Sequence, residues 1–351
     1  MPATAKAGDI LWVQQRSDAP TGASGWNVIY VSQIQPGVMS YVSGEVFVPN
    51  AQNSQARNVV LWNHPTAGMT DDCAPSRETL GDENGNNAVP AVQDLINAGD
   101  LVVASDYPGL GLYGPAYYMT GDPNARASLD LIRAVRSVPA LSASANFVQY
   151  GWSQGGQTSE HLDALAKSYA PELHPVATAL IAPATRIKAL TQISMPLPGP
   201  DGYMLMTLRG IQAAYPQLKF SDFLTPAAME EMPLIADGCY DPWGATAMAN
   251  WHQPGAMAPG SPWSNAMTAI DNFQPGGTMP YTIFQGSDDT TVPPSLTQAE
   301  RTVLCKAGSP VQYNEMAGKD HTTIVPVAAA ALPQWIADRF AGKPAPSNCP
   351  A

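Results

Sequence analysis

The strongest constraint on the fold of this 351-residue chain comes from residues 151–155, which read GWSQG. An apolar run, 146–150, precedes them, and a helix-compatible run, 157–169, follows. A serine on a sharp turn between a strand and a helix needs small neighbours, because a base and a substrate carbonyl must both approach its hydroxyl. The two glycines meet that need, so the stretch predicts a strand, a strained turn that presents Ser153, and a helix. The alternative is an ordinary glycine-rich turn.

The acid that would support such a serine follows a second apolar stretch. In α/β-hydrolases the serine, the acid and a histidine come in that order along the chain, with the acid after a late strand. Residues 281–284 read as a buried strand, and the turn after it contains Asp288 and Asp289. Asp289 stands in an Asp-x-x-Val-Pro spacing similar to the acid loop of many α/β-hydrolases, so we predict that it is the acid. Asp288 fits an Asx turn, or the N-cap of a helix near 295–307, better.

The base would be a histidine in a loop near the C-terminus. Of the five histidines only His321 follows the acid loop, and it precedes an apolar run that begins near Thr323. We therefore predict that Ser153, Asp289 and His321 form a catalytic triad, with His321 as the general base. The other four histidines come too early in the chain for this role and are expected on loops, helix surfaces or an inserted segment: His64, His161, His174 and His252.

The negative charge that develops during attack on an ester needs two preorganised N–H donors. In this fold one donor is the residue after the nucleophile, here Gln154, and the other lies in the loop after an early strand. Residues 58–63 read as that strand, and the small residues that follow indicate Thr66 or Ala67 as the second donor. Pro65 has no N–H and is excluded. The choice between Thr66 and Ala67 stays open.

Two aromatic residues are candidates for the substrate pocket. Tyr107 lies in the glycine-rich stretch 106–111, directly after an apolar strand at 101–105, where this fold places a loop beside the active site. Trp152 is the immediate neighbour of the predicted nucleophile. A plain turn is the alternative interpretation of residues 106–111.

Composition argues against several classes of function. Charged residues make up 13% of the chain, against a typical value of about 25%. The formal net charge of −12 opposes binding to phosphate backbones and anionic membrane surfaces, so no nucleic-acid partner is expected. No run approaches the roughly 20 apolar residues of a membrane span. The acidic pairs at 71–72 and 288–289 are isolated, and neither a metal nor a cofactor is expected.

Four cysteines without a CxxC spacing argue against a zinc site and favour two disulfides in an oxidising compartment. They allow three pairings, of which we favour Cys73–Cys239 and Cys305–Cys349; reduced, buried cysteines are the alternative. The N-terminal residues lack an apolar signal core. We expect a secreted or periplasmic protein from which the signal peptide has been removed and to which an initiator Met has been added. A cytosolic protein is the alternative.

The rest of the chain alternates between strand and helix patterns. Two leading segments, 26–34 and 38–48, read as antiparallel strands joined by a Gln-Pro-Gly turn. The segments that follow read as strands near 58–63, 101–105, 146–151 and 176–181 and as helices near 88–98 and 124–138. This alternation predicts an α/β fold with a mostly parallel central sheet flanked by helices.

The alternation stops between about residues 185 and 278, where prolines are frequent. This interval falls between the strand after the nucleophile and the strand before the acid. We therefore predict an α/β-hydrolase core of residues 1–184 and 279–351 with a mainly helical cap or lid at 185–278. The insertion is rich in methionine and large aromatic residues, which suit an adaptable apolar binding surface. Packing within the cap's own small core is the alternative for most of them.

Several stretches resemble the secretory lipase family of Candida antarctica lipase A-like α/β-hydrolases. The most specific are DCAPS at 72–76 and YAPEL at 169–173, and the resemblance extends over nearly the whole chain. It implies an α/β-hydrolase fold with a helical lid, a Ser-Asp-His triad, disulfides, and activity on carboxylic esters with broad acyl and alcohol tolerance. Family members often carry a longer C-terminal flap than this chain has after His321, about thirty residues, which implies a more open pocket mouth.

Together these observations predict a carboxylic ester hydrolase, a lipase or carboxylesterase, that acts on a small-molecule or lipid ester through an acyl-enzyme on Ser153. An acyltransferase or amide hydrolase with the same triad is one alternative. A non-catalytic binding protein with the hydrolase fold is another. The residues do not determine the oligomeric state, and a monomer is the default.

Overall fold

The computed structural model describes residues 4–81, 88–236, 239, 246–273 and 277–350, and these residues are organised around one nine-stranded sheet. The strands are β1 Ile10–Arg16, β2 Ala23–Gln35, β3 Val38–Pro49, β4 Arg57–Asn63, β5 Leu101–Ser105, β6 Ala143–Trp152, β7 His174–Ile181, β8 Tyr281–Gly286 and β9 Val311–Met316. Their order in the sheet is β1-β2-β3-β5-β4-β6-β7-β8-β9. The pairs among β1, β2, β3 and β5 are antiparallel, and every pair from β5–β4 to β8–β9 is parallel.

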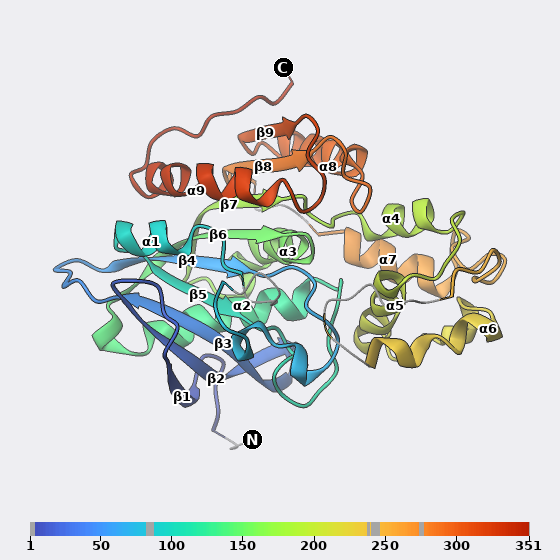
Figure 1. Ribbon diagram of the computed structural model, residues 1–351, viewed down its shortest axis with the longest axis horizontal. Helices are drawn as coiled ribbons and strands as arrows, with labels where there is room; N and C mark the ends of the chain where they lie inside the picture. The colour runs from blue at the N-terminus through green and yellow to red at the C-terminus, as the bar shows by residue number, and fades with distance from the viewer. Residues whose placement is uncertain (1–3, 82–87, 237–238, 240–245, 274–276, 351) are drawn as a thin grey trace.

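Helices cover both faces of the sheet (Figure 1). They are α1 Val92–Ala98, α2 Asp122–Arg136, α3 Gln154–Tyr169, α8 Pro294–Lys306 and α9 Val325–Phe340. Successive side chains of a strand point to opposite faces, and β4 shows why both faces need cover. Val59 and Leu61 pack in one core with α2 and α3, whereas Val60 and Trp62 pack in another with α1 and α9. The interior parallel strands are therefore buried on both sides, whereas β9, at the edge of the sheet, is mostly half-buried.

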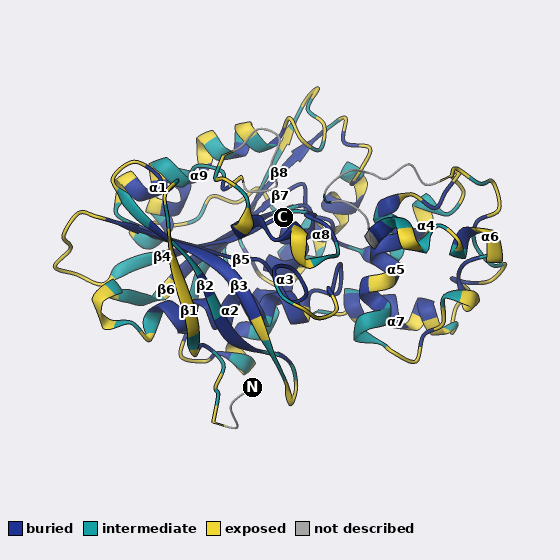
Figure 2. Cartoon of the chain, turned by 60° about the horizontal axis from the view of Figure 1, so that its bottom comes forward, coloured by how far each residue is buried: buried dark blue, intermediate teal, exposed yellow. Residues whose placement is uncertain are grey.

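The structure confirms the predicted fold class and most of the predicted strands, but it adds one strand that the sequence pattern did not indicate. That strand is β1, which pairs with β2 at the antiparallel end of the sheet. Its five central residues are exposed, including Trp12 at 45%, and Figure 2 shows it in yellow beside the buried central strands. An edge strand with exposed side chains lacks the alternation of apolar and polar residues on which strand prediction depends.

The segment between β7 and β8 contributes helices and none of the nine strands. They are α4 Ile187–Ser194, α5 Gly202–Ala214, α6 Pro226–Met229 and α7 Pro262–Asp271. In Figure 1 they lie together to the right of the sheet. They share a separate hydrophobic core whose large members include Trp251, Trp263 and Phe223, each at most 1% exposed. Met206 and Met267 are fully buried in this core, so the expectation that most of these methionines pack internally describes them well.

Both expected disulfides are formed, Cys73–Cys239 and Cys305–Cys349, and the described residues contain no free cysteine. The first bond connects the 3₁₀ helix Asp71–Cys73 to the chain just after the 3₁₀ helix Met232–Ala236. It packs against Gly68, where a Cβ would clash with the sulfur of Cys73. The bond therefore joins the loop after β4 directly to the segment between β7 and β8.

A buried carboxyl near the start of β5 gives the first testable prediction. Asp100 is 5% exposed and accepts one hydrogen bond, from Asn58 Nδ2 at 3.3 Å. Burial disfavours the charged form and raises the pKa of Asp100 from 3.8 to about 6. The folded protein thus holds this proton more tightly than the unfolded chain, and the free energy of unfolding falls as the pH rises from about 4 to about 6.

We expect Asp100→Asn to remove this fall, so that the variant is more stable than the wild type at pH 8 by about 2–3 kcal/mol and similar to it at pH 4. Urea unfolding at the two pH values measures the difference. Asp94→Asn, which removes an exposed carboxyl from the same region, is the control and should change little. Parallel pH profiles for wild type and Asp100→Asn would show that Asp100 ionises normally.

Candidate active site

The turn between β6 and α3 holds Ser153 in a strained conformation. Its φ is 53° and its ψ is −115°, a combination that residues with a side chain rarely adopt. The glycines on both sides are required by space: a Cβ on Gly155 would clash with the carbonyl oxygen of Asn63, and one on Gly151 would clash with the carbonyl oxygen of Gly155. Residues 151–155 therefore form the sharp strand-to-helix turn that the sequence predicts, and Ser153 lies at its tip.

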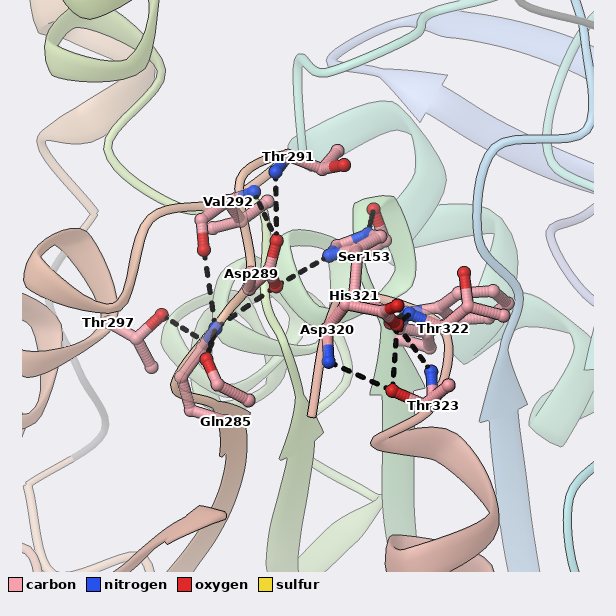
Figure 3. A network of polar contacts seen from close by, with 12 residues as sticks. Ser153, Gln285, Asp289, Thr291, Val292, Thr297, Asp320, His321, Thr322 and Thr323 are labelled. Atoms are coloured by element: carbon pink, nitrogen blue, oxygen red, sulfur yellow. Dashed lines mark hydrogen bonds and ion pairs between the residues drawn. The ribbon is translucent and has the colours of Figure 1, made fainter. Parts of the chain in front are cut away.

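Three segments far apart in the sequence meet at Ser153. His321, in the loop before α9, lies with Nε2 2.9 Å from Ser153 Oγ and with Nδ1 2.8 Å from Asp289 Oδ2. Asp289 itself follows β8 (Figure 3). With the proton on Nδ1, the imidazole donates to Asp289 and accepts from the serine hydroxyl. The three residues predicted from chain order thus form one continuous hydrogen-bonded chain.

The carboxylate of Asp289 is 97% buried and bonded at both oxygens. Oδ1 accepts from the backbone N–H groups of Thr291 (2.9 Å) and Val292 (2.8 Å), and Oδ2 accepts from Gln285 Nε2 (3.0 Å) as well as from His321. The Asx turn expected for Asp288 is therefore made by Asp289. Asp288 is exposed and bonds the hydroxyl of Ser287. Nor does Asp288 cap the following helix, because the N-cap of α8 is Pro293.

Gln285 is a site residue that the sequence analysis missed. Its Oε1 accepts a hydrogen bond from Thr297 Oγ1 on α8 at 2.7 Å, and both residues are fully buried (Figure 3). That bond directs the NH₂ group of Gln285 toward Asp289, because in the flipped amide the NH₂ group would face the hydroxyl donor of Thr297. The only signal in the sequence is a polar residue at the end of an apolar strand, which is not specific.

The loop that carries His321 is held from two sides. Trp152 Nε1 donates to the backbone carbonyl of His321 at 3.1 Å, and the two rings lie 5.7 Å apart. Asp320 Oδ1 accepts from the backbone N–H groups of Thr322 (3.0 Å) and Thr323 (2.8 Å), and these bonds lower the pKa of Asp320. Trp152 was expected in the substrate pocket; the structure instead places it against His321.

The loop after β4 contains the two residues expected to donate the second N–H to an oxyanion. Thr66 and Ala67 are both buried, and Thr66 Oγ1 lies 2.7 Å from the hydroxyl of Tyr118. On the other side of the serine, Gln154 is the first residue of α3, so its N–H has no partner within the helix. The loop after β4 begins beside the turn, because the carbonyl oxygens of Asn63 and His64 lie against Gly155. That Thr66 or Ala67 donates to an oxyanion stays a prediction.

Tyr107 supports the loop after β4 from beneath. Its ring stacks on His64 at 4.1 Å, and its hydroxyl donates to the His64 backbone carbonyl at 3.2 Å. Burial lowers the pKa of His64, so this imidazole is neutral and acts as a fixed part of the loop. Tyr107 is not among the residues that line the cavity beside Ser153, in contrast to the expectation. A strained φ of 70° at Tyr107 directs its ring into the core instead.

A cavity of about 270 Å³ opens beside Ser153. Its walls come from α4, from α5, from residues 197–199 and from residues 290–292, with Trp251 and Tyr118 among the large side chains. Met119 and Met204 also line it, and Met204 is the one described methionine between residues 185 and 278 that does so. The segment between β7 and β8 thus forms most of the cavity wall.

The described residues hold no group of three or more His, Cys, Asp or Glu side chains placed to bind a metal ion. Within the same part of the chain, no helix is long and apolar enough to span a membrane.

Comparison with known proteins places this chain in a family. The family model for secretory lipases matches residues 87–242 and 267–348. Lipase 5 of Candida albicans is 26% identical over 98% of this chain and 80% of its own length, and secreted triacylglycerol lipase LIP7 of Malassezia globosa is 26% identical over 80% and 64%.

Solved structures agree on the fold. Candida antarctica lipase A in its closed state superposes with a TM-score of 0.80 at 19% identity, covering 99% of this chain and 87% of that one. The rice cell wall degrading esterase LipA of Xanthomonas oryzae gives a TM-score of 0.73 at 20% identity, covering 95% and 98%. The family model covers well over half of the sequence. The chain therefore belongs to the secretory lipase family of carboxylic ester hydrolases.

Proposed function

We propose that this protein hydrolyses carboxylic esters through a covalent acyl-enzyme on Ser153. The observation that carries the proposal is the hydrogen-bonded chain from Asp289 through His321 to Ser153, which ends at the wall of a cavity. A serine with an adjacent base that is itself oriented by an acid is the arrangement required for nucleophilic catalysis.

In the first half of the reaction, Ser153 Oγ attacks the ester carbonyl while His321 Nε2 takes the hydroxyl proton. Asp289 stabilises the resulting imidazolium through Nδ1. The carbonyl oxygen becomes an oxyanion, which the backbone N–H of Gln154 and that of Thr66 or Ala67 stabilise. His321 then returns its proton to the leaving alkoxide, and the alcohol departs. In the second half, water attacks the acyl-enzyme by the same steps and releases the acid.

We also propose that the chain divides into an α/β-hydrolase core, residues 1–184 and 279–351, and a cap, residues 185–278. Support comes from the separate hydrophobic core of α4–α7 and from the share of the cavity wall that α4 and α5 provide. The substrate we propose is a small-molecule or lipid ester. The two disulfides and the secretory family support action outside the cytosol.

Labelling with a fluorophosphonate probe tests the proposal directly. The probe reacts only with an activated serine, so we expect one covalent adduct, which peptide mass spectrometry should locate at Ser153. A folded wild-type protein that stays unlabelled would contradict the proposal and favour a binding protein. Competing alcohols and matched amide substrates, offered in the same assays, separate hydrolysis of esters from acyl transfer and from amide hydrolysis.

Gln285 gives a second test of the triad. We expect Gln285→Leu to lower kcat about 10- to 100-fold with KM little changed, because Asp289 would lose one charge-assisted hydrogen bond, worth about 1.5–3 kcal/mol. Gln298→Leu, which removes an exposed amide from α8, is the matched control and should leave kcat unchanged. Equal kcat for Gln285→Leu and wild type would mean that Asp289 needs no support from this side chain.

A further inference from the structure

Two threonines in the wall of the cavity beside Ser153 have hydroxyl groups that make no hydrogen bond to the described residues. Thr191 on α4 is 2% exposed and Thr207 on α5 is 9% exposed, and both line the cavity. Among the described residues, neither side chain makes a hydrogen bond that meets normal geometry. Neither hydroxyl oxygen is fully enclosed. Among the described residues, the side-chain oxygens that are both fully buried and without a hydrogen-bond partner do not include Thr191 Oγ1 or Thr207 Oγ1. The hydroxyls are therefore reachable from the cavity.

Other threonines in this chain show that the missing bonds are not a general property of helical threonine. Thr268 Oγ1 on α7 donates to the Ser264 carbonyl at 2.7 Å, and Thr302 Oγ1 on α8 donates to the Gln298 carbonyl at 2.9 Å. These are the bonds to the preceding helical turn that a threonine in a helix commonly makes. Thr191 and Thr207 make no such bond, although their positions within helices would allow it.

The neighbourhood makes these hydroxyls costly to cover with hydrocarbon. Ile187, Leu190, Met204 and Trp251 line the same cavity, and their side chains offer the hydroxyls no strong acceptor. The indole N–H of Trp251 is a donor, and it already donates to the backbone carbonyl of Leu197. A hydrocarbon chain in this cavity would exclude water and leave both hydroxyls unpaired, at a cost of about 1–3 kcal/mol each. A chain carrying an oxygen atom would satisfy them.

We propose that Thr191 and Thr207 are specificity residues, and that the preferred substrate is an ester whose chain carries hydroxyl or ether oxygens rather than one with a purely hydrocarbon chain. The proposal rests on the ester hydrolysis proposed above and adds the substrate class. A site built to hydrogen-bond an oxygen discriminates against the analogue that lacks it, because its own polar groups are then left unpaired.

Matched ester pairs test the proposal. One pair places the chain on the acyl side, p-nitrophenyl 5-methoxypentanoate against p-nitrophenyl heptanoate. The other places it on the alcohol side, 5-methoxypentyl acetate against heptyl acetate. Each pair has equal chain length, and the ether oxygen is too far from the carbonyl to alter its reactivity. The measured quantity is the ratio of kcat/KM within each pair, for wild type and for the double variant Thr191→Val and Thr207→Val, which keeps the side-chain shape.

In the wild type we expect the oxygenated member of at least one pair to be preferred, and we expect that ratio to fall about 10-fold in the double valine variant. The double serine variant, Thr191→Ser and Thr207→Ser, keeps both hydroxyls and should keep the ratio. Thr302→Val, outside the cavity, is the matched control and should also leave it unchanged. If the double valine variant does not fold, the kcat/KM ratios of the two single valine variants are compared with that of the serine variant instead.

Hydrolysis of p-nitrophenyl acetate separates the two levels of failure. If wild type hydrolyses the acetate in a Ser153-dependent manner but both ratios are the same in the valine and serine variants, the specificity proposal is overturned and the esterase proposal stands. If wild type shows no Ser153-dependent hydrolysis of any ester, the proposed function itself is wrong. A ratio that falls equally in Thr302→Val would also overturn the assignment to Thr191 and Thr207.

Discussion

Replacement of Ser153 by alanine is expected to lower kcat for p-nitrophenyl acetate by about 10⁴- to 10⁶-fold, the range seen when a triad serine is removed from a serine hydrolase. The loss is large because the acyl-enzyme cannot form, and only the oxyanion donors and the cavity remain to assist direct attack by water. The fold should survive, because alanine removes a single oxygen and leaves the backbone of the turn unchanged. Steady-state kinetics with p-nitrophenyl acetate, run beside thermal unfolding, measure both effects.

Ser159→Ala is a control on the same helix. Ser159 is buried, and its hydroxyl donates to the Gly155 carbonyl at 2.9 Å and accepts from Asn63 Nδ2 at 2.8 Å, so this variant removes a hydroxyl near the turn without touching His321. Its kcat should stay within about 10-fold of wild type, because each of these bonds is worth about 1 kcal/mol and neither reaches the triad. Turnover by Ser153→Ala close to the wild-type rate would eliminate Ser153 as the nucleophile.

Asp289→Asn is expected to lower kcat by about 10⁴-fold, as in other triads in which the acid becomes an amide. The surroundings of Asp289 explain the direction. Two backbone N–H groups, those of Thr291 and Val292, donate to Oδ1, so the amide oxygen of the variant must take that place. The amide NH₂ then faces His321, and Nδ1 has to accept instead of donate. Nε2 would carry the proton and could no longer take one from Ser153.

The neighbouring carboxyl provides the control for this variant. Asp288 is exposed and does not bond His321, so Asp288→Asn should retain close to full activity. Measurement of kcat/KM between pH 5 and 9 for both variants decides between the two acids. A 10⁴-fold loss in Asp288→Asn with an active Asp289→Asn would reverse the assignment.

Sequence reasoning located the parts of the site that depend on chain order and local turns. Ser153 was predictable because only glycine fits on both sides of its turn. Asp289 was predictable because it follows an apolar strand, and His321 because it is the only histidine after the acid loop, in the order this fold requires. The buried parallel strands were equally accessible, because both of their faces are apolar. These features are set by residues close together in the sequence.

Features set by contacts between distant residues were not predictable in the same way. Tyr107 follows the expected strand, but its positive φ turns the ring toward His64 and away from the cavity. Trp152 is the neighbour of Ser153 in the sequence, but it is the last residue of β6 while Ser153 lies in the turn that follows, and its indole bonds the loop of His321 instead. The pairing of Gln285 with Thr297 depends on where α8 packs, which no local pattern reveals.

The contact between Gly68 and the Cys73–Cys239 bond has a consequence for recombining parts of such proteins. The segment between β7 and β8 is not an exchangeable module, because one of its disulfide bonds ends in the loop after β4. A chimera that takes residues 185–278 from a relative must also take that relative's residues at positions 68 and 73. If the incoming segment lacks a cysteine at position 239, Cys73 is left as a free thiol against Gly68. Substitutions between β7 and β8 and substitutions at positions 68–73 therefore have to be compatible with each other, although more than a hundred residues separate the two regions in the chain.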